Sequence, residues 1–70
     1  MAEKVVLVVG GGGREHALCI GLSKSLHVSK IHCSPGNAGT ASMATNHSVS
    51  ASDIEGLVSL AKQVSADLVV

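Results

Sequence analysis

Residues 5 to 16 read VVLVVGGGGREH, and the order of residue types in this stretch decides the fold. The first part, Val5 to Val9, is a continuous apolar run that is rich in β-branched side chains. An alternating run would leave one face in water, whereas a solid run is typical of a strand buried on both faces of a parallel sheet. The glycines Gly10 to Gly13 then interrupt regular structure. We therefore expect a central strand that ends in a glycine loop.

A helix is expected over residues 14–25, directly after the loop. Apolar and small residues recur there at helical spacing and predict the face that packs on the sheet. That face consists of Ala17, Leu18, Gly21, Leu22 and Ser25. Gly21 on this face suggests close packing against a strand. Ile20 lies outside it, so we expect the outer side of the helix to be partly covered by another segment.

The second half of the chain repeats the alternation of strand and helix. Residues 30–34 predict a weak strand, residues 35–37 a turn, and residues 47–49 a short third strand. Residues 52–55 form a capping-box pattern, in which the Ser52 hydroxyl accepts from the N–H of Glu55. The helix that follows is expected to bury Ile54, Leu57, Val58, Ala61 and Val64, and an apolar strand begins at residue 67.

This order of elements predicts the α/β class. Right-handed crossovers between parallel strands give a Rossmann-like, doubly wound sheet. The chain has 70 residues and no Phe, Tyr or Trp, so its core is thin for an independent domain. No linker, internal repeat or second domain is visible, and the last apolar run has no closing turn. We expect residues 1–70 to form a truncated, incomplete amino-terminal domain.

Composition excludes several classes of function. The formal net charge is zero and no aromatic residue is present, which argues against a nucleic-acid partner. The apolar run of residues 5–9 is too short to span a membrane, and no signal or transit peptide is visible. Cys19 and Cys33 lack the spacing of a metal or redox motif and are expected to be buried free thiols. A cytoplasmic protein without a metal site in this segment is predicted.

The glycine loop indicates phosphate binding. It lies between a buried strand and a helix start, where unpaired N–H groups and the positive end of the helix dipole favour an anion. Gly10 and Gly12 fit the dinucleotide pattern, but Glu15 occupies the position of its last glycine. No lysine follows the loop as in nucleotide triphosphatases. A phosphate other than that of a nicotinamide or flavin cofactor is favoured, and a tight turn needed only for packing stays open.

Charged residues in the first helical turn extend this prediction. The guanidinium of Arg14 is close enough to the loop to pair with the same anion, with a plain surface charge as the alternative. Glu15 suits the helix dipole. His16 has no visible carboxylate or metal partner and is expected to be structural.

Two segments resemble the glycinamide ribonucleotide synthetase family of ATP-grasp ligases. They are Val8 to Leu18, with the sequence VVGGGGREHAL, and Pro35 to Ala41, with the sequence PGNAGTA. A lone glycine loop is a weak signal, but both segments at this separation are specific. Residues 52–54 and 66–70 are also similar to the family, so the resemblance covers essentially the whole chain. It implies that the fold is the Rossmann-like domain that precedes the ATP-grasp body.

The resemblance also implies an activity for the complete protein. Members of the family join glycine to 5-phosphoribosylamine in de novo purine synthesis, and they use ATP and Mg²⁺ (or Mn²⁺) to activate glycine as an acyl phosphate. Later domains hold ATP and metal, so no catalytic residue and no cofactor is expected in this fragment, which alone should be inactive. The resemblance implies a sugar and phosphate site made by Gly10, Gly12, Gly13, Arg14, Pro35, Gly36 and Asn37. Within it, Gly12, Gly13 and Arg14 would lie by the ribose phosphate.

Two alternatives to a ligase domain remain at this point. The chain could be a nucleotide-binding βαβ module of another protein, although the acid expected after the second strand of such a module is absent from residues 31–34. It could also be a non-catalytic truncated isoform. In many eukaryotes the synthetase is fused to later purine enzymes, so a fusion partner is a further expectation from the resemblance.

Overall fold

A four-stranded parallel sheet forms the centre of the molecule. The computed structural model describes residues 4–70, with strands β1 (Lys4–Gly10), β2 (Val28–Pro35), β3 (Thr45–Asn46) and β4 (Leu68–Val69). They lie in the order β3-β2-β1-β4, and all neighbouring pairs run parallel. The first strand is therefore central, as a solid apolar run predicts, and the α/β class is confirmed.

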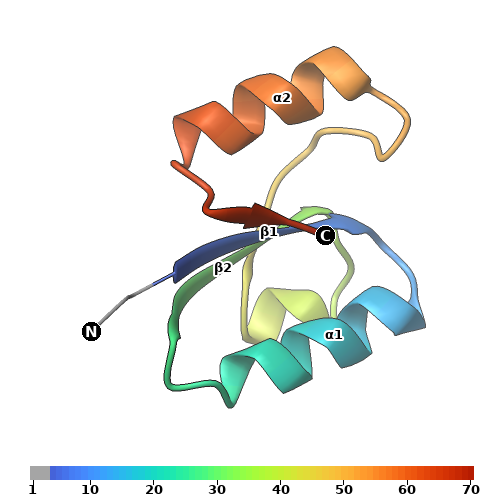
Figure 1. Cartoon of the computed structure of the whole chain (residues 1–70). Coiled ribbons are helices and arrows are strands. Elements are labelled where there is room, and N and C mark those ends of the chain that lie inside the picture. Colours follow the sequence, from blue (N-terminus) through green and yellow to red (C-terminus); the bar gives the residue numbers. More distant parts are fainter. Residues whose placement is uncertain (1–3) are drawn as a thin grey trace.

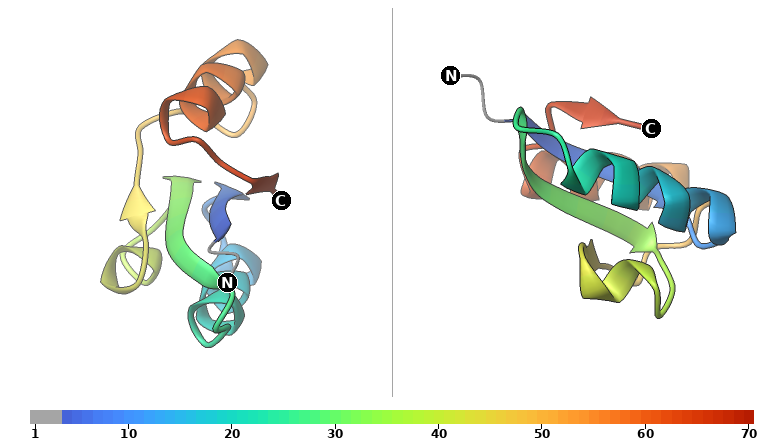
Figure 2. Two further views of the ribbon diagram at one scale, coloured as in Figure 1. Left: turned by 60° about the vertical axis from the view of Figure 1, so that its left-hand side comes forward. Right: turned by 90° about the horizontal axis from the view of Figure 1, so that it is seen from below.

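Helices cover both faces of this sheet (Figures 1 and 2). Helix α1 (Gly13–Ser23) and the short 3-10 helix η1 (Thr40–Ser42) lie on one face, and α2 (Ile54–Gln63) lies on the other. The chain leaves β1 toward β2 on the first face and returns from β3 to β4 on the second. This doubly wound, Rossmann-like path places the switch in strand order beside β1, where such sheets bind ligands at the carboxyl ends of their strands.

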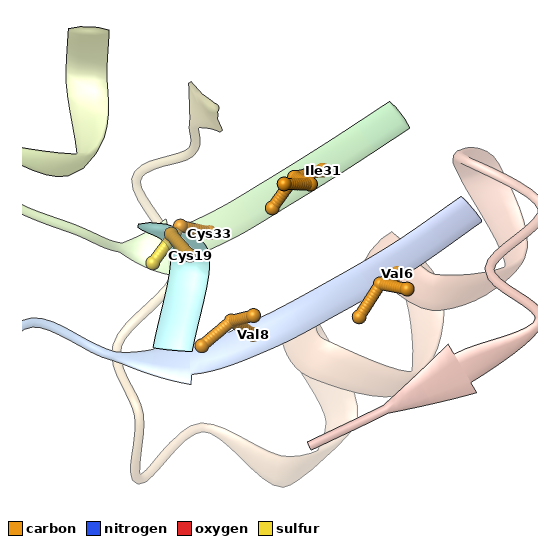
Figure 3. Packing of buried hydrophobic residues seen from close by; sticks show 5 residues of the cluster. All are labelled: Val6, Val8, Cys19, Ile31 and Cys33. Atoms are coloured by element: carbon orange, nitrogen blue, oxygen red, sulfur yellow. The ribbon is translucent and has the colours of Figure 1, made fainter. Parts of the chain in front are cut away.

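The strand β1 is the most buried element. Val6, Leu7 and Val8 are at most 2% exposed, because β2 and β4 flank the strand and a helix covers each face. On the α1 face, Val6 and Val8 pack with Ile31, Cys33 and Cys19 (Figure 3). Both cysteines are buried and free, as expected. Burial and the neighbouring Cys33 raise the pKa of the Cys19 thiol to about 11.

The rotation of α1 differs from the prediction. Cys19 is its buried residue, whereas Ala17, Leu18 and Gly21 are exposed. A Cβ at Gly21 would meet nothing within 4 Å, so this glycine is not a close contact with a strand. Contacts at the first turn, described below, fix the rotation and override a weak apolar pattern. The outward side chains line a shallow apolar hollow formed by Arg14, Ala17, Leu18, Gly21 and Leu22.

The start of the second helix also differs. Asp53 rather than Ser52 is the N-cap, and its carboxylate accepts from the N–H of Gly56 at 3.0 Å. The hydroxyl of Ser52 pairs instead with that of Ser50. Both residue types favour N-caps, and the later one begins the helix.

The buried face of α2 is narrower than expected. Leu60 is 4% exposed and packs inward, while Ile54 and Val58 are 69% and 50% exposed. Leu57, Ala61 and Val64 from the predicted face are half-buried. The prediction was thus right for one side of the apolar stripe and wrong for the other.

The third strand lies at Thr45–Asn46, two residues before the predicted one. After His47 the chain leaves the sheet, because the Ser34 hydroxyl bonds to the backbone of His47 and Val49 and holds this segment over the end of β2. The predicted strand over residues 30–34 is longer than expected and spans Val28–Pro35. Among residues 4–70, no helix has the length and apolar character required to cross a membrane.

Candidate phosphate-binding loops

The glycine loop after β1 and the turn after β2 are joined at the carboxyl edge of the sheet. The N–H of Gly36 donates to the carbonyl of Gly10 at 3.0 Å. The side-chain amide of Asn37 donates to the carbonyls of Gly11 and Gly12 at 2.9 and 3.3 Å. The two segments that stand out in the sequence are therefore one structural unit, although 25 residues separate Gly12 from Asn37.

A second set of contacts shows why several positions in these loops are glycines. A Cβ at Gly11 would lie 2.9 Å from the carbonyl oxygen of Gly36. A Cβ at Gly39 would overlap the ring of His16, which packs directly against that backbone. His16 therefore has the structural role expected from its lack of polar partners, and it ties the first turn of α1 to the turn after β2.

Gly10 is fixed by its own conformation. Its φ is 135°, a region that side chains rarely adopt, and a Cβ there would lie 2.6 Å from the side chain of Glu15. The structure would require glycine at Gly10 and Gly11 even without a ligand. The packing alternative for the loop thus accounts for its first half.

Glu15 closes the loop from the helix side. Its carboxylate accepts from the N–H of Gly12 at 2.8 Å. Gly12 is the N-cap of α1 and has no side chain of its own to cap the helix, so Glu15 supplies half of a capping box. This side chain takes one of the unpaired amide groups at the helix start, a role that is more specific than the general dipole effect predicted for it.

Gly13 differs from the other loop glycines. The carbonyl of Gly12 points to Asn37, and the peptide bond between Gly12 and Gly13 is trans, so the N–H of Gly13 points the opposite way. A Cβ at Gly13 would meet nothing within 4 Å. The exposed Arg14 follows directly. The second half of the loop is therefore exposed, with free space beside Gly13 and a cation at Arg14.

The turn after β2 is held by hydrogen bonds with Thr40 and Asn46. The N–H of Thr40 donates to Oδ1 of Asn37 at 2.9 Å, which leaves the amide nitrogen of Asn37 to face the glycine loop. The hydroxyl of Thr40 accepts from the N–H of Asn37 at 2.8 Å and donates to Oδ1 of Asn46 at the same distance. Sequence reasoning missed Thr40 and Asn46. The spacing of three residues between Asn37 and Thr40 could have indicated Thr40, because it is typical of side-chain-capped turns.

All the residues expected to form the sugar and phosphate site lie at this edge of the sheet. Pro35 is exposed at the end of β2 and pairs in register with Gly10. The complete set is Gly10, Gly12, Gly13, Arg14, Pro35, Gly36 and Asn37. Within residues 4–70, no three His, Cys, Asp or Glu side chains lie together as a metal site would require. Backbone N–H groups at a helix start and the guanidinium of Arg14 are groups that can attract an anion.

Comparison with known proteins adds an independent line of support. Residues 4–70 match the family model described as "Phosphoribosylglycinamide synthetase, N domain". A phosphoribosylamine–glycine ligase of Streptomyces coelicolor is 52% identical over 65 residues, which are 93% of this chain and 16% of the relative. The ligase of Caulobacter vibrioides is 43% identical over 70 residues, which are 100% of this chain and 16% of that protein.

The chain thus spans about one sixth of the length of the curated relatives that it matches. The family match covers nearly every residue, including both loops and the strands that carry them. The chain belongs to the phosphoribosylglycinamide synthetase family and corresponds to its N domain.

Proposed function

We propose that this chain forms the amino-terminal part of a phosphoribosylamine–glycine ligase, and that its glycine loop binds the phosphate of 5-phosphoribosylamine. The family match supports the ligase. The observation that carries the phosphate site is the contrast within the loop: protein atoms crowd the Cβ positions of Gly10 and Gly11, whereas a Cβ at Gly13 would meet nothing within 4 Å.

The proposed binding mode uses backbone and side chain together. The N–H groups of Gly13 and Arg14 belong to the first turn of α1 and have no carbonyl one turn earlier to accept from them. A phosphate dianion at this point would accept both, and the guanidinium of Arg14 would add a full positive charge. The turn of Pro35, Gly36 and Asn37 would then lie beside the sugar.

ATP and Mg²⁺ belong to the proposed function of the complete ligase, where they would supply the activation of glycine. The described residues do not fit a metal ion, so the role proposed for this chain is to bind and orient the phosphorylated sugar. A cytoplasmic location is part of the proposal, because buried free thiols are typical of a reducing compartment. Fusion to later purine enzymes is compatible with this role.

The test is a Gly13→Val substitution in the full-length ligase that carries this chain. The new side chain meets no protein atom near its Cβ, so the fold should persist while the space above the loop is filled. Losing one or two charge-assisted hydrogen bonds, at about 1.5–3 kcal/mol each, should lower kcat/KM for phosphoribosylamine roughly ten- to a hundred-fold or more. The KM values for ATP and glycine should stay unchanged.

Gly21→Val is the matched control. Gly21 lies on the same helix, and a Cβ there also meets nothing within 4 Å, but it is far from the loop end. This variant should keep the kinetic constants of the parent. A raised KM for ATP with an unchanged KM for phosphoribosylamine in the Gly13→Val enzyme would refute the assignment of the loop to the sugar phosphate.

A further inference from the structure

We infer that Asn46, which lies on β3 outside both loops, is a positioning residue for the proposed phosphate loop. It acts through Thr40 and Asn37 and does not itself reach the open side of the loop. The inference rests on the proposed function, since it names a residue that sets the direction of the same backbone donors.

The side chain of Asn46 is paired at both ends. Its amide nitrogen donates to the carbonyl of Asn37 at 2.8 Å, and its oxygen accepts from the hydroxyl of Thr40 at 2.8 Å. It also lies directly behind Gly36, where a Cβ would overlap it. A side chain at this position needs a donor and an acceptor on a short, planar group, and asparagine provides both.

Thr40 passes this constraint to the turn. Its side chain is fully buried, and its hydroxyl has a single proton to donate. With that proton on Asn46, the oxygen is free to accept from the N–H of Asn37 at 2.8 Å, and the N–H of Thr40 holds Oδ1 of Asn37 at 2.9 Å. The amide of Asn37 therefore has one orientation, with its nitrogen toward the glycine loop.

The last link is the peptide geometry of the loop. Asn37 holds the carbonyls of Gly11 and Gly12, and each trans peptide turns the following N–H to the opposite side. The N–H of Gly12 then donates to Glu15, and that of Gly13 points away from the carbonyl that Asn37 holds. The carbonyl of Gly12 also accepts from the N–H of His16 at 3.1 Å. If Asn37 were free to rotate, the carbonyl of Gly11 would lose its donor and that of Gly12 would lose one of two, so the N–H groups of Gly12 and Gly13 would be held less firmly in direction.

The test compares Asn46→Asp with Thr45→Val in the full-length ligase. Asn46→Asp keeps the acceptor for Thr40 and removes the donor to Asn37, while Thr45 is the exposed neighbour on the same strand. We expect the KM for phosphoribosylamine to rise roughly tenfold in Asn46→Asp, as for the loss of one partly buried hydrogen bond. The kcat at saturation and the KM for ATP should not change, and Thr45→Val should match the parent.

A second pair of variants tests the route through Thr40. Thr40→Val removes the hydroxyl with little change of shape and should raise the same KM, whereas Thr40→Ser should restore it. Amide hydrogen exchange at Gly12, whose N–H donates to Glu15, provides a readout that does not depend on turnover. Exchange there should accelerate in Asn46→Asp and Thr40→Val, while exchange in α2 should not.

The outcomes separate the two proposals. If the Gly12 amide exchanges faster in these variants but no substitution in the loop changes the KM for phosphoribosylamine, the positioning role holds and the proposed ligand is wrong. If exchange at Gly12 and the KM for phosphoribosylamine both match the parent in folded Asn46→Asp and Thr40→Val enzymes, Asn46 does not position the loop and the inference is overturned.

Discussion

The face of the sheet covered by α1 and the face covered by α2 bury different chemistry. On the α1 face, Val6, Val8, Ile31 and the two thiols form one cluster of apolar and sulfur groups. Successive side chains of a strand point to opposite faces, so Leu7, His32 and Ser34 lie on the α2 face. That face therefore contains two polar side chains among its buried residues.

The polar side chains of the α2 face hold the segment that leads from β3 to α2. The hydroxyl of Ser34 donates to the carbonyl of Val49 at 2.6 Å and accepts from its N–H at 3.1 Å. His32 and His47 share a hydrogen bond between Nδ1 and Nε2 of 2.9 Å, in which one ring donates. The α1 face thus contributes apolar packing, which has no preferred direction. The α2 face fixes the path of the chain through hydrogen bonds.

The largest effect is expected on the apolar face. Ile31→Ala removes a side chain that is 6% exposed and should cost about 2–5 kcal/mol of unfolding free energy. This loss is comparable to the whole stability of a small domain, so the isolated chain should be largely unfolded by circular dichroism. Ile20→Ala is the matched control, because Ile20 is 38% exposed. Equal losses for the two variants would contradict the assignment of the core to this face.

A smaller effect is expected for the hydrogen bonds of Ser34 on the α2 face. Ser34→Ala leaves both backbone groups of Val49 without their partner, and the unfolding free energy should fall by about 1–3 kcal/mol. Ser48 is exposed on the adjoining segment, and Ser48→Ala should leave stability unchanged. Denaturant titration of both variants measures the difference in stability. Similar midpoints for the two would show that Ser34 does not hold the segment that leads from β3 to α2.

The smallest effect concerns pH and is confined to the α2 face. Burial, followed by the charges of His47 and Lys30, lowers the pKa of His32 below its ordinary value of 6.5. The unfolded chain then binds more protons, so the stability contributed by neutral His32 is present above about pH 6.5 and is lost as the pH falls through the folded-state pKa. Melting temperatures measured from pH 8 to pH 5 should decline at the acid end.

The His32→Gln variant should show a weaker acid-end decline than the parent, and His27→Gln should show the same decline, since His27 is exposed. A pH profile that is equally steep in the parent and in His32→Gln would place the titrating group elsewhere and would make the two faces alike in their response to acid.

The features that sequence patterns predicted well are those with one local solution. A solid β-branched run such as Val5 to Val9 is typical of a central strand. Parallel strands bring their following loops to one edge, so the meeting of the two loops could be expected. The rotation of α1 could not, because contacts from His16 to Gly39 and from Glu15 to Gly12 set it. These contacts link residues whose proximity no helical period reveals.

The same reasoning explains the misplaced boundaries. Ser52 and Asp53 are both good N-caps, and local propensity does not choose between them. Asn46 escaped notice because its partners depend on the register between β2 and β3, in which Cys33 lies opposite Asn46. A hydrogen bond that forms only after two strands have paired produces no periodic pattern in the sequence.

The strand order also has a consequence for the timing of protein synthesis. β1 is made first, yet one of its two neighbours is β4, and the bond from the N–H of Val5 to the carboxylate of Asp67 closes a separation of 62 residues. While the ribosome is making the intervening segment, one side of the most apolar strand has no partner. An unpaired strand edge can recruit a strand of another chain, so this edge of β1 stays open to such pairing until β4 emerges.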